Sequence, residues 1–116
     1  MIIYVCSKLR GMKPYSAEQY ERNLHLAAVY CAEVASEGHV PIAPHLYFSE
    51  FLDDEVPEDR EAGIRMGQEV LKICDEVWVF GAESGIGDGM AAEIKLAESL
   101  GKPVKYREDK FSDCLK

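Results

Sequence analysis

Glu93 is the residue in this chain whose position is hardest to explain by packing. The apolar spacing from Met90 to Leu100 predicts a helix, and a turn of about 100° per residue puts Glu93 on the same arc as Met90 and Ile94. A carboxylate facing a core costs several kcal/mol unless it is paired, hydrogen-bonded or open to a pocket. The glycine-rich segment 85–89 precedes this helix. An ionised carboxylate in such a pocket could act as a nucleophile or stabilise positive charge.

Two other predicted helices carry a polar residue on their apolar arcs. Asn23 falls among Ala27 and its apolar neighbours, and Arg60 is in line with Ile64. Each has an explanation without a ligand, because Asn23 could bond to the backbone and Arg60 could reach solvent or pair with a carboxylate. Three polar intrusions near helix starts nevertheless favour one pocket.

Strand-like and helix-like segments alternate along the chain, which predicts a single α/β domain over residues 1–116. We expect a doubly wound parallel sheet of four to five strands flanked by helices, similar to flavodoxin or Rossmann folds. The expected strands are residues 2–6, 39–43, 76–80 and 104–106, the expected helices are 16–36, 57–74 and 90–100, and an aromatic loop covers 44–57.

The loops that follow the first three strands should meet at the carboxyl ends of the sheet, where open α/β folds bind ligands. A helix N-terminus after the glycines would favour an anion there, although such turns are also common for purely structural reasons. His45 could contact a ligand or simply be surface. The candidate contacts in these loops are Ser7, Lys8, Arg10, Gly11, His45, Gly87, Asp88, Gly89 and Met90.

Composition excludes several classes of partner. The net charge is -8, with 13 basic and 21 acidic residues, so a nucleic acid polymer or an anionic membrane surface is not expected as a partner. No apolar run approaches the roughly 18 residues of a membrane span, and no signal peptide is recognised, so we expect a cytoplasmic protein.

The four cysteines predict neither a disulfide framework nor a metal site. They are far apart, without a CxxC pair, and three lie in segments that should be buried. The histidines also lack zinc-site spacing. We therefore expect reduced thiols, and neither a metal nor a cofactor.

Four short motifs, in order, give the chain a family resemblance. They are YVCSKLRG at 4–11, Asp75 ahead of an apolar strand, GMAAE at 89–93 and GKPV at 101–104. Together they resemble the nucleoside 2-deoxyribosyltransferase superfamily, which includes the 2'-deoxynucleoside 5'-phosphate N-hydrolases, and especially its small bacterial and phage members. One position departs from those enzymes, because Gly87 stands where they carry Ser or Asp.

The resemblance implies a role for several residues. Glu93 matches the carboxylate nucleophile, Asp75 an acidic residue near the base and sugar, and Tyr4 a tyrosine that orients the nucleophile. Arg10 and Gly11 match a phosphate-handling pair. The resemblance also implies a nucleoside or nucleotide substrate and a homodimer or higher homo-oligomer.

A nucleophilic Glu93 must be ionised. Burial would raise the pKa of this carboxyl, whereas the helix N-terminus and a nearby Tyr4 hydroxyl would lower it. We expect the hydrogen bonds to outweigh desolvation. The carboxylate would then stabilise an oxocarbenium-like state or form a glycosyl intermediate, as in retaining glycosidases.

Two hypotheses remain from the sequence. The first is an N-glycosidase or deoxyribosyltransferase with Glu93 as nucleophile, in which Lys8 and Arg10 would favour a 5'-phosphate. The second is a non-catalytic nucleotide sensor of the same fold, which the departure at Gly87 supports. A phospho-receiver is disfavoured because the first strand ends in Ser7 and Lys8 rather than in a phosphorylatable Asp.

Overall fold

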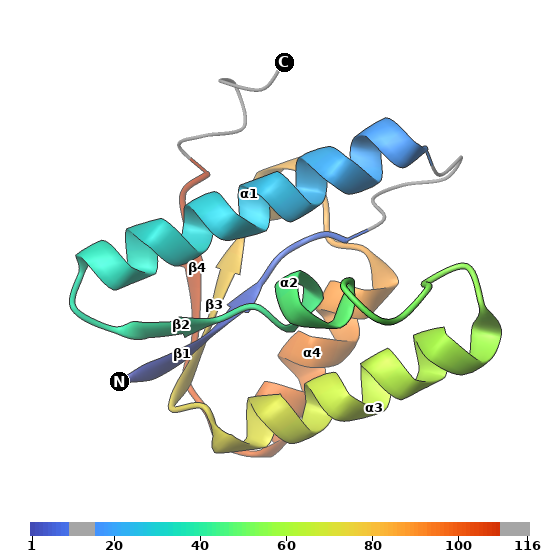
Figure 1. Cartoon of the computed structure of the whole chain (residues 1–116). Helices are drawn as coiled ribbons and strands as arrows, with labels where there is room; N and C mark the ends of the chain where they lie inside the picture. Colours follow the sequence, from blue (N-terminus) through green and yellow to red (C-terminus); the bar gives the residue numbers. More distant parts are fainter. Residues whose placement is uncertain (10–15, 110–116) are drawn as a thin grey trace.

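The structure, a computed structural model, describes residues 1–9 and 16–109. These residues form a four-stranded, fully parallel sheet in the order β2-β1-β3-β4 (Figure 1). The elements in chain order are β1 (Ile2–Cys6), α1 (Ala17–Ser36), β2 (Val40–Ile42), α2 (Pro44–Phe48), α3 (Pro57–Ile73), β3 (Glu76–Phe80), a 3-10 turn (Ala82–Ser84), α4 (Asp88–Ser99) and β4 (Val104–Arg107). The α/β class and the parallel sheet expected from the sequence are confirmed.

Helices cover both faces of the sheet (Figure 1). Alternate residues of β1 point to opposite faces: Ile3 and Val5 pack with α1, whereas Tyr4 and Cys6 pack with α3 and α4. The chain therefore has two core layers, one on each side of the two central strands. The connecting helices switch from one face of the sheet to the other between β1 and β3, and a doubly wound sheet opens a crevice at this point.

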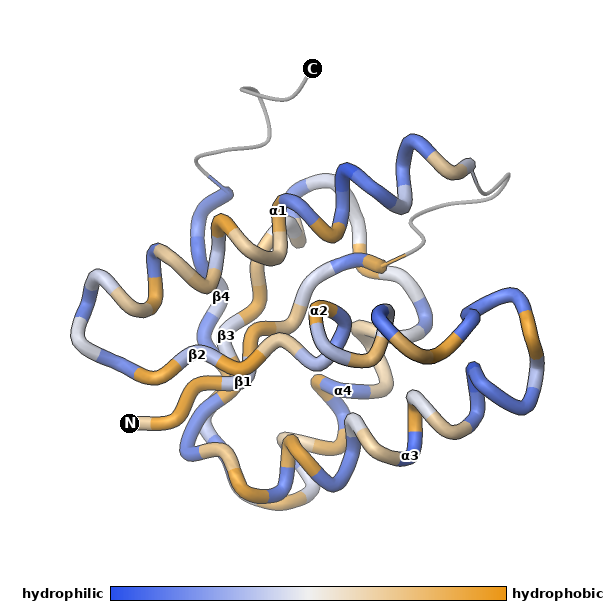
Figure 2. The backbone as a smooth tube through the Cα atoms, viewed as in Figure 1, coloured by the Kyte–Doolittle hydropathy of each residue, from blue (hydrophilic) through white to orange (hydrophobic). Residues whose placement is uncertain are grey.

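The buried strands and the amphipathic helices explain this arrangement. All five residues of β3 are buried, as expected for a strand covered on both faces. Figure 2 shows hydrophobic residues along β1 and an alternation of hydrophobic and hydrophilic residues along α1 and α3. Within residues 1–9 and 16–109, no helix is both long and apolar enough to cross a membrane.

The segment 44–57, expected to be a loop, contains the short helix α2. Pro44 occupies its first turn, where a missing N–H costs nothing, and the Ser49 N–H donates to the carbonyl of His45. The neighbouring aromatic rings of Tyr47, Phe48 and Phe51 lie 5.2–5.9 Å apart. The sequence pattern missed α2 because five residues are too few to show a helical period.

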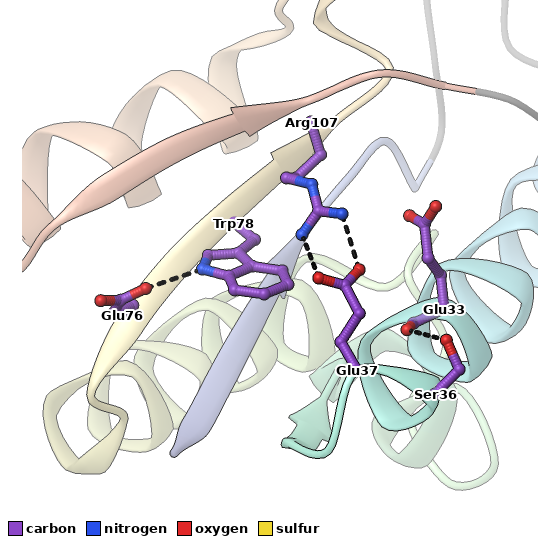
Figure 3. A network of polar contacts seen from close by, with 6 residues as sticks. All are labelled: Glu33, Ser36, Glu37, Glu76, Trp78 and Arg107. Atoms are coloured by element: carbon purple, nitrogen blue, oxygen red, sulfur yellow. Dashed lines mark hydrogen bonds and ion pairs between the residues drawn. The ribbon is translucent and has the colours of Figure 1, made fainter.

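A polar network joins the end of α1 to the sheet on the face opposite α3 and α4 (Figure 3). The Arg107 guanidinium donates to both carboxylate oxygens of Glu37, at 2.6 and 3.3 Å, and lies 4.4 Å from the centre of the Trp78 ring. The Trp78 indole N–H donates to Glu76 at 2.9 Å. This network fixes the edge strand β4 to α1.

Candidate active site

A cavity of about 700 Å³ opens at the carboxyl end of β1, between α2, α3 and the start of α4. Its size is within the range of small-molecule sites, and its walls mix apolar side chains with a few polar groups. The titratable residues in its wall are Tyr4, Lys8, Tyr20, His45, Asp54, Asp59, Arg60, Asp88 and Glu93. A smaller cavity of about 150 Å³ lies on the α1 face.

Glu93 faces the large cavity from α4. The residue is partly buried, and its Oε2 atom is enclosed without a hydrogen-bond partner among the described residues. Burial raises the pKa of the Glu93 carboxyl to about 7, although hydrogen bonding with the Cys6 thiol and the Tyr4 hydroxyl lowers it. The expectation that hydrogen bonds would outweigh desolvation is therefore wrong. The Glu93 carboxyl therefore titrates near neutral pH rather than near its ordinary pKa of 4.5.

Tyr4 is a residue of β1 and lies beside Glu93. It is almost fully buried, with 2% of its surface exposed. Burial and then the charge of Glu93 raise the pKa of the Tyr4 phenol well above 10. The hydroxyl therefore stays protonated and can donate to the carboxylate. Its oxygen is 3.6 Å from the point where a Cβ on Gly67 would stand, so this glycine of α3 leaves room for the phenol.

His45 projects from α2 into the same cavity. Its Nε2 lies 3.1 Å from the carbonyl oxygen of Ser7. A carbonyl can only accept a hydrogen bond, so Nε2 carries the proton and Nδ1 presents a lone pair. Burial lowers the pKa of His45, while the Ser7 bond and the charge of Asp54 oppose this. The neutral ring is thus an acceptor at neutral pH.

Ser7 and Lys8 follow β1 and line both cavities. The Ser7 hydroxyl oxygen is buried and has no hydrogen-bond partner among the residues the structure describes. The Lys8 ammonium donates to the Gly81 carbonyl at 2.7 Å and to the Ser84 hydroxyl at 2.8 Å. Lys8 therefore holds the loop after β3 and offers little of its ammonium to a ligand.

The start of α4 completes the wall. Gly87, Asp88, Gly89 and Met90 all line the large cavity. Gly87 is the N-cap residue; its carbonyl accepts from the Ala91 N–H at 2.9 Å, but without a side chain it offers no acceptor to the first N–H groups of α4. Arg60, on the first turns of α3, is an exposed residue of the same wall.

The structure does not bring Asp75 to this site. Asp75 precedes β3, so it lies at the amino ends of the parallel strands, opposite the cavity. Its Oδ2 accepts a hydrogen bond from the Ile2 N–H at 2.7 Å, and its own N–H donates to the Ile2 carbonyl. Placing Asp75 beside Glu93 was wrong, and its side chain secures the start of β1 instead.

Asn23 is also separated from Glu93. It lies on α1, on the other face of the sheet, where it lines the small cavity. Its amide donates to the Leu9 carbonyl at 2.9 Å and accepts from the Gln19 side chain at 3.1 Å. The prediction that Asn23 shares one cleft with Glu93 was therefore wrong, and bonding to the backbone accounts for its burial. Arg10 and Gly11 lie outside the described residues.

Two carboxylates that were not predicted from the sequence face the large cavity. Asp54 precedes α3, and Asp59 lies in its first turn. The Asp59 Oδ2 also accepts from the Asp53 N–H at 2.9 Å. Their position could have been predicted from the sequence, because a helix that follows the loop after β2 begins on the ligand-binding edge of a parallel sheet. Within the described ranges, no group of three or more His, Cys, Asp or Glu side chains could hold a metal.

The family model described as "Domain of unknown function (DUF7768)" matches residues 1–107. The chain belongs to this family. No curated protein matches it. Among solved structures, the chain is similar to a 2-deoxyribosyltransferase from the psychrotolerant bacterium Bacillus psychrosaccharolyticus, with a TM-score of 0.64 and 22% identity over 93% of this chain and 72% of that one. This DUF7768 domain therefore shares the fold of a deoxyribosyltransferase.

Proposed function

We propose that this protein cleaves the N-glycosidic bond of a nucleoside, by hydrolysis or by transfer to another base, with Glu93 as the nucleophile. The observation that carries the proposal is the Glu93 carboxylate, which faces the large cavity with its Oε2 enclosed and unpartnered. A buried carboxylate oxygen without a partner is costly. A ligand whose sugar carbon becomes electron-poor would supply the missing interaction.

In the proposed reaction, an oxygen of ionised Glu93 attacks the anomeric carbon of the sugar. The bond from that carbon to the base nitrogen breaks, and the base leaves with the bonding electron pair and takes up a proton from solvent water. The Tyr4 hydroxyl orients the attacking carboxylate. Water or a second base then attacks the glycosyl ester and releases Glu93.

Two further groups in the wall are suited to the second half of this reaction. The Nδ1 lone pair of His45 can accept a proton from the attacking water, because Nε2 is committed to the Ser7 carbonyl. Asp54 and Asp59 take the place proposed from the sequence for Asp75, since they are acidic groups in the wall that holds Glu93.

The charges of the wall favour an uncharged nucleoside over its 5'-monophosphate. Its described part contains four carboxylates, whereas its cations are Arg60 and Lys8, and Lys8 is already bonded to Gly81 and Ser84. A phosphate would meet net repulsion there. The deoxyribosyltransferase of similar fold is described as a catalyst for the synthesis of nucleosides, which agrees with this choice.

The test is to incubate the protein with a panel of nucleosides and 5'-monophosphates and to measure free base by chromatography. A second free base, added in parallel, separates transfer from hydrolysis. We expect Glu93→Gln to abolish base release and Glu98→Gln, an exposed residue of the same helix, to retain it. Equal rates in the parent and in Glu93→Gln would refute the assignment of the nucleophile.

The alternative function is a nucleotide sensor that binds without turnover. Gly87 supports it, because the N-cap of α4 lacks the side chain that related enzymes place there. A nucleotide that raises the melting temperature while no member of the panel releases base would favour the sensor. Homo-oligomerisation and a cytoplasmic location, both expected from the sequence, remain predictions.

A further inference from the structure

We propose that the substrate is a nucleoside whose base carries a permanent positive charge, such as a pyridinium or an N-alkylated purine, and that Asp54 and Asp59 recognise this charge. This substrate class rests on the proposed function for its chemistry. Recognition of the charge, however, can be measured by binding alone, without any turnover.

Carboxylates from the starts of two helices line the large cavity. Asp54 stands just before α3 and Asp59 in its first turn, while Asp88 and Glu93 come from α4. Asp54 and Asp59 are partly buried, so salt screens their charges less than those of surface residues. The bond from the Asp53 N–H to the Asp59 Oδ2, at 2.9 Å, holds that carboxylate in place. This side of the cavity therefore attracts a cation.

The cations in the described part of the wall do not balance these carboxylates. The Lys8 ammonium is bonded to the Gly81 carbonyl at 2.7 Å and to the Ser84 hydroxyl at 2.8 Å. Arg60 is exposed, so water and salt screen its guanidinium. His45 adds a lone pair at Nδ1, because its Nε2 proton is donated to a carbonyl. The wall is therefore rich in acceptors and negative charge.

Three further features of the wall point to a polar, aromatic ligand. The Ser7 Oγ and the Glu93 Oε2 are buried without a hydrogen-bond partner among the described residues, and Ser7 is only 4% exposed. Buried polar atoms normally have partners, so both atoms favour a ligand with polar groups. Phe48 lines the same cavity, with its ring centre 5.7 Å from that of Tyr47 and 5.9 Å from that of Phe51. The face of such a ring attracts a cation in addition to stacking on it.

A charged base also removes the need for a proton donor at the leaving group. When Glu93 attacks the anomeric carbon, the bond to the base breaks and its electron pair moves onto the ring nitrogen. This pair neutralises the positive charge, so the base leaves as a neutral molecule. Water then attacks the glycosyl ester, gives a proton to the Nδ1 of His45 and releases the sugar and the Glu93 carboxylate. The described wall suits this reaction, because the Nε2 proton of His45 is committed to the Ser7 carbonyl.

The binding experiment compares nicotinamide riboside, which is permanently charged, with its uncharged dihydro form. Both are titrated calorimetrically into Glu93→Gln, which prevents turnover. We expect the charged form to bind at least about tenfold more tightly, and this preference to fall about threefold or more when Asp54→Asn or Asp59→Asn is added. Added salt should also reduce the preference. Glu58→Gln is the matched control, because Glu58 is exposed in the same helical turn and does not line the cavity.

The inference would be overturned if the charged form did not bind, if both forms bound equally, or if the preference survived in the double variant Asp54→Asn/Asp59→Asn. Release of free base from the charged and the neutral nucleosides by the parent protein is measured separately. A charge preference that depends on both aspartates, without any base release, would reject the proposed function and retain the recognition. Base release from neutral nucleosides, without a charge preference in binding, would reject the recognition and retain the proposed function.

Discussion

Tyr4 on β1 and Glu93 on α4 face each other, and each changes the pKa of the other, one upward and one downward. The charge of Glu93 raises the pKa of the Tyr4 phenol, and the Tyr4 hydroxyl lowers the pKa of the Glu93 carboxyl. Both effects keep the phenol protonated and favour an ionised carboxylate. Burial nevertheless has the larger influence on Glu93, and this balance has measurable consequences.

The first prediction concerns the pH dependence of activity. The nucleophile must be ionised, and the pKa of Glu93 is raised from 4.5 to about 7. We therefore expect kcat/KM for base release to rise as pH increases through about 7 and to fall tenfold per unit well below it. A pH–rate profile checks this. An acid limb near pH 4.5 would show that the free protein stabilises the carboxylate far more than the observed burial allows.

The second prediction concerns stability. The folded-state pKa of Glu93 is raised, so the unfolded chain loses this proton at a lower pH than the folded protein does. The contribution of the protonated Glu93 to the free energy of unfolding is therefore fully present below pH 4.5 and is lost as pH rises through about 7. Glu93→Gln cannot ionise. It should therefore gain up to about 3 kcal/mol relative to the parent between pH 4 and pH 8, measured by denaturant unfolding. The exposed control Glu98→Gln should show a nearly constant difference over this range.

The third prediction concerns the Tyr4 hydroxyl. Tyr4→Phe removes a donor to a charged group without emptying the core, and such bonds contribute about 1.5–3 kcal/mol. We expect base release to fall by about 10- to 100-fold and the acid limb to move to higher pH. Tyr106→Phe, on the exposed surface of β4, should change neither. Parent-like kinetics in Tyr4→Phe would show that the phenol is only a packing residue.

The fourth prediction tests the placement of Asp75. Its carboxylate accepts from the Ile2 N–H at the edge of the sheet opposite the cavity. Asp75→Ala should therefore cost about 1–2 kcal/mol of unfolding free energy and leave kcat/KM per folded molecule unchanged. A large loss of kcat with unaltered stability would return Asp75 to the site.

The fifth prediction concerns the link between β4 and α1. Arg107→Ala removes a paired contact to Glu37 and the stacking on Trp78, and we expect a loss of about 1–2 kcal/mol in unfolding free energy. The control is Arg65→Ala, an exposed residue of α3, which should stay within about 0.5 kcal/mol of the parent. Equal stabilities for the two variants would show that the network is energetically neutral.

Apart from the short helix α2, the sequence by itself determined the order of strands and helices, and it determined the side of α4 that Glu93 occupies. Both depend on local periodicity, which a chain reveals without its partners. The helix expected over 16–36 agrees with α1, and the Ser16 hydroxyl caps it by accepting from the Gln19 N–H at 3.0 Å. The resemblance carried by short motifs pointed to the deoxyribosyltransferase fold, which the structure shares.

Only the tertiary structure decided which polar residues meet. Asn23 and Glu93 are both polar intrusions on apolar arcs, but α1 and α4 cover opposite faces of the sheet. Asp75 lies at the amino edge of β3, whereas Asp54 and Asp59 reach the cavity from α3. The pKa of Glu93 was also decided there, because desolvation depends on everything that surrounds a group, whereas periodicity shows only the side of the helix on which that group lies.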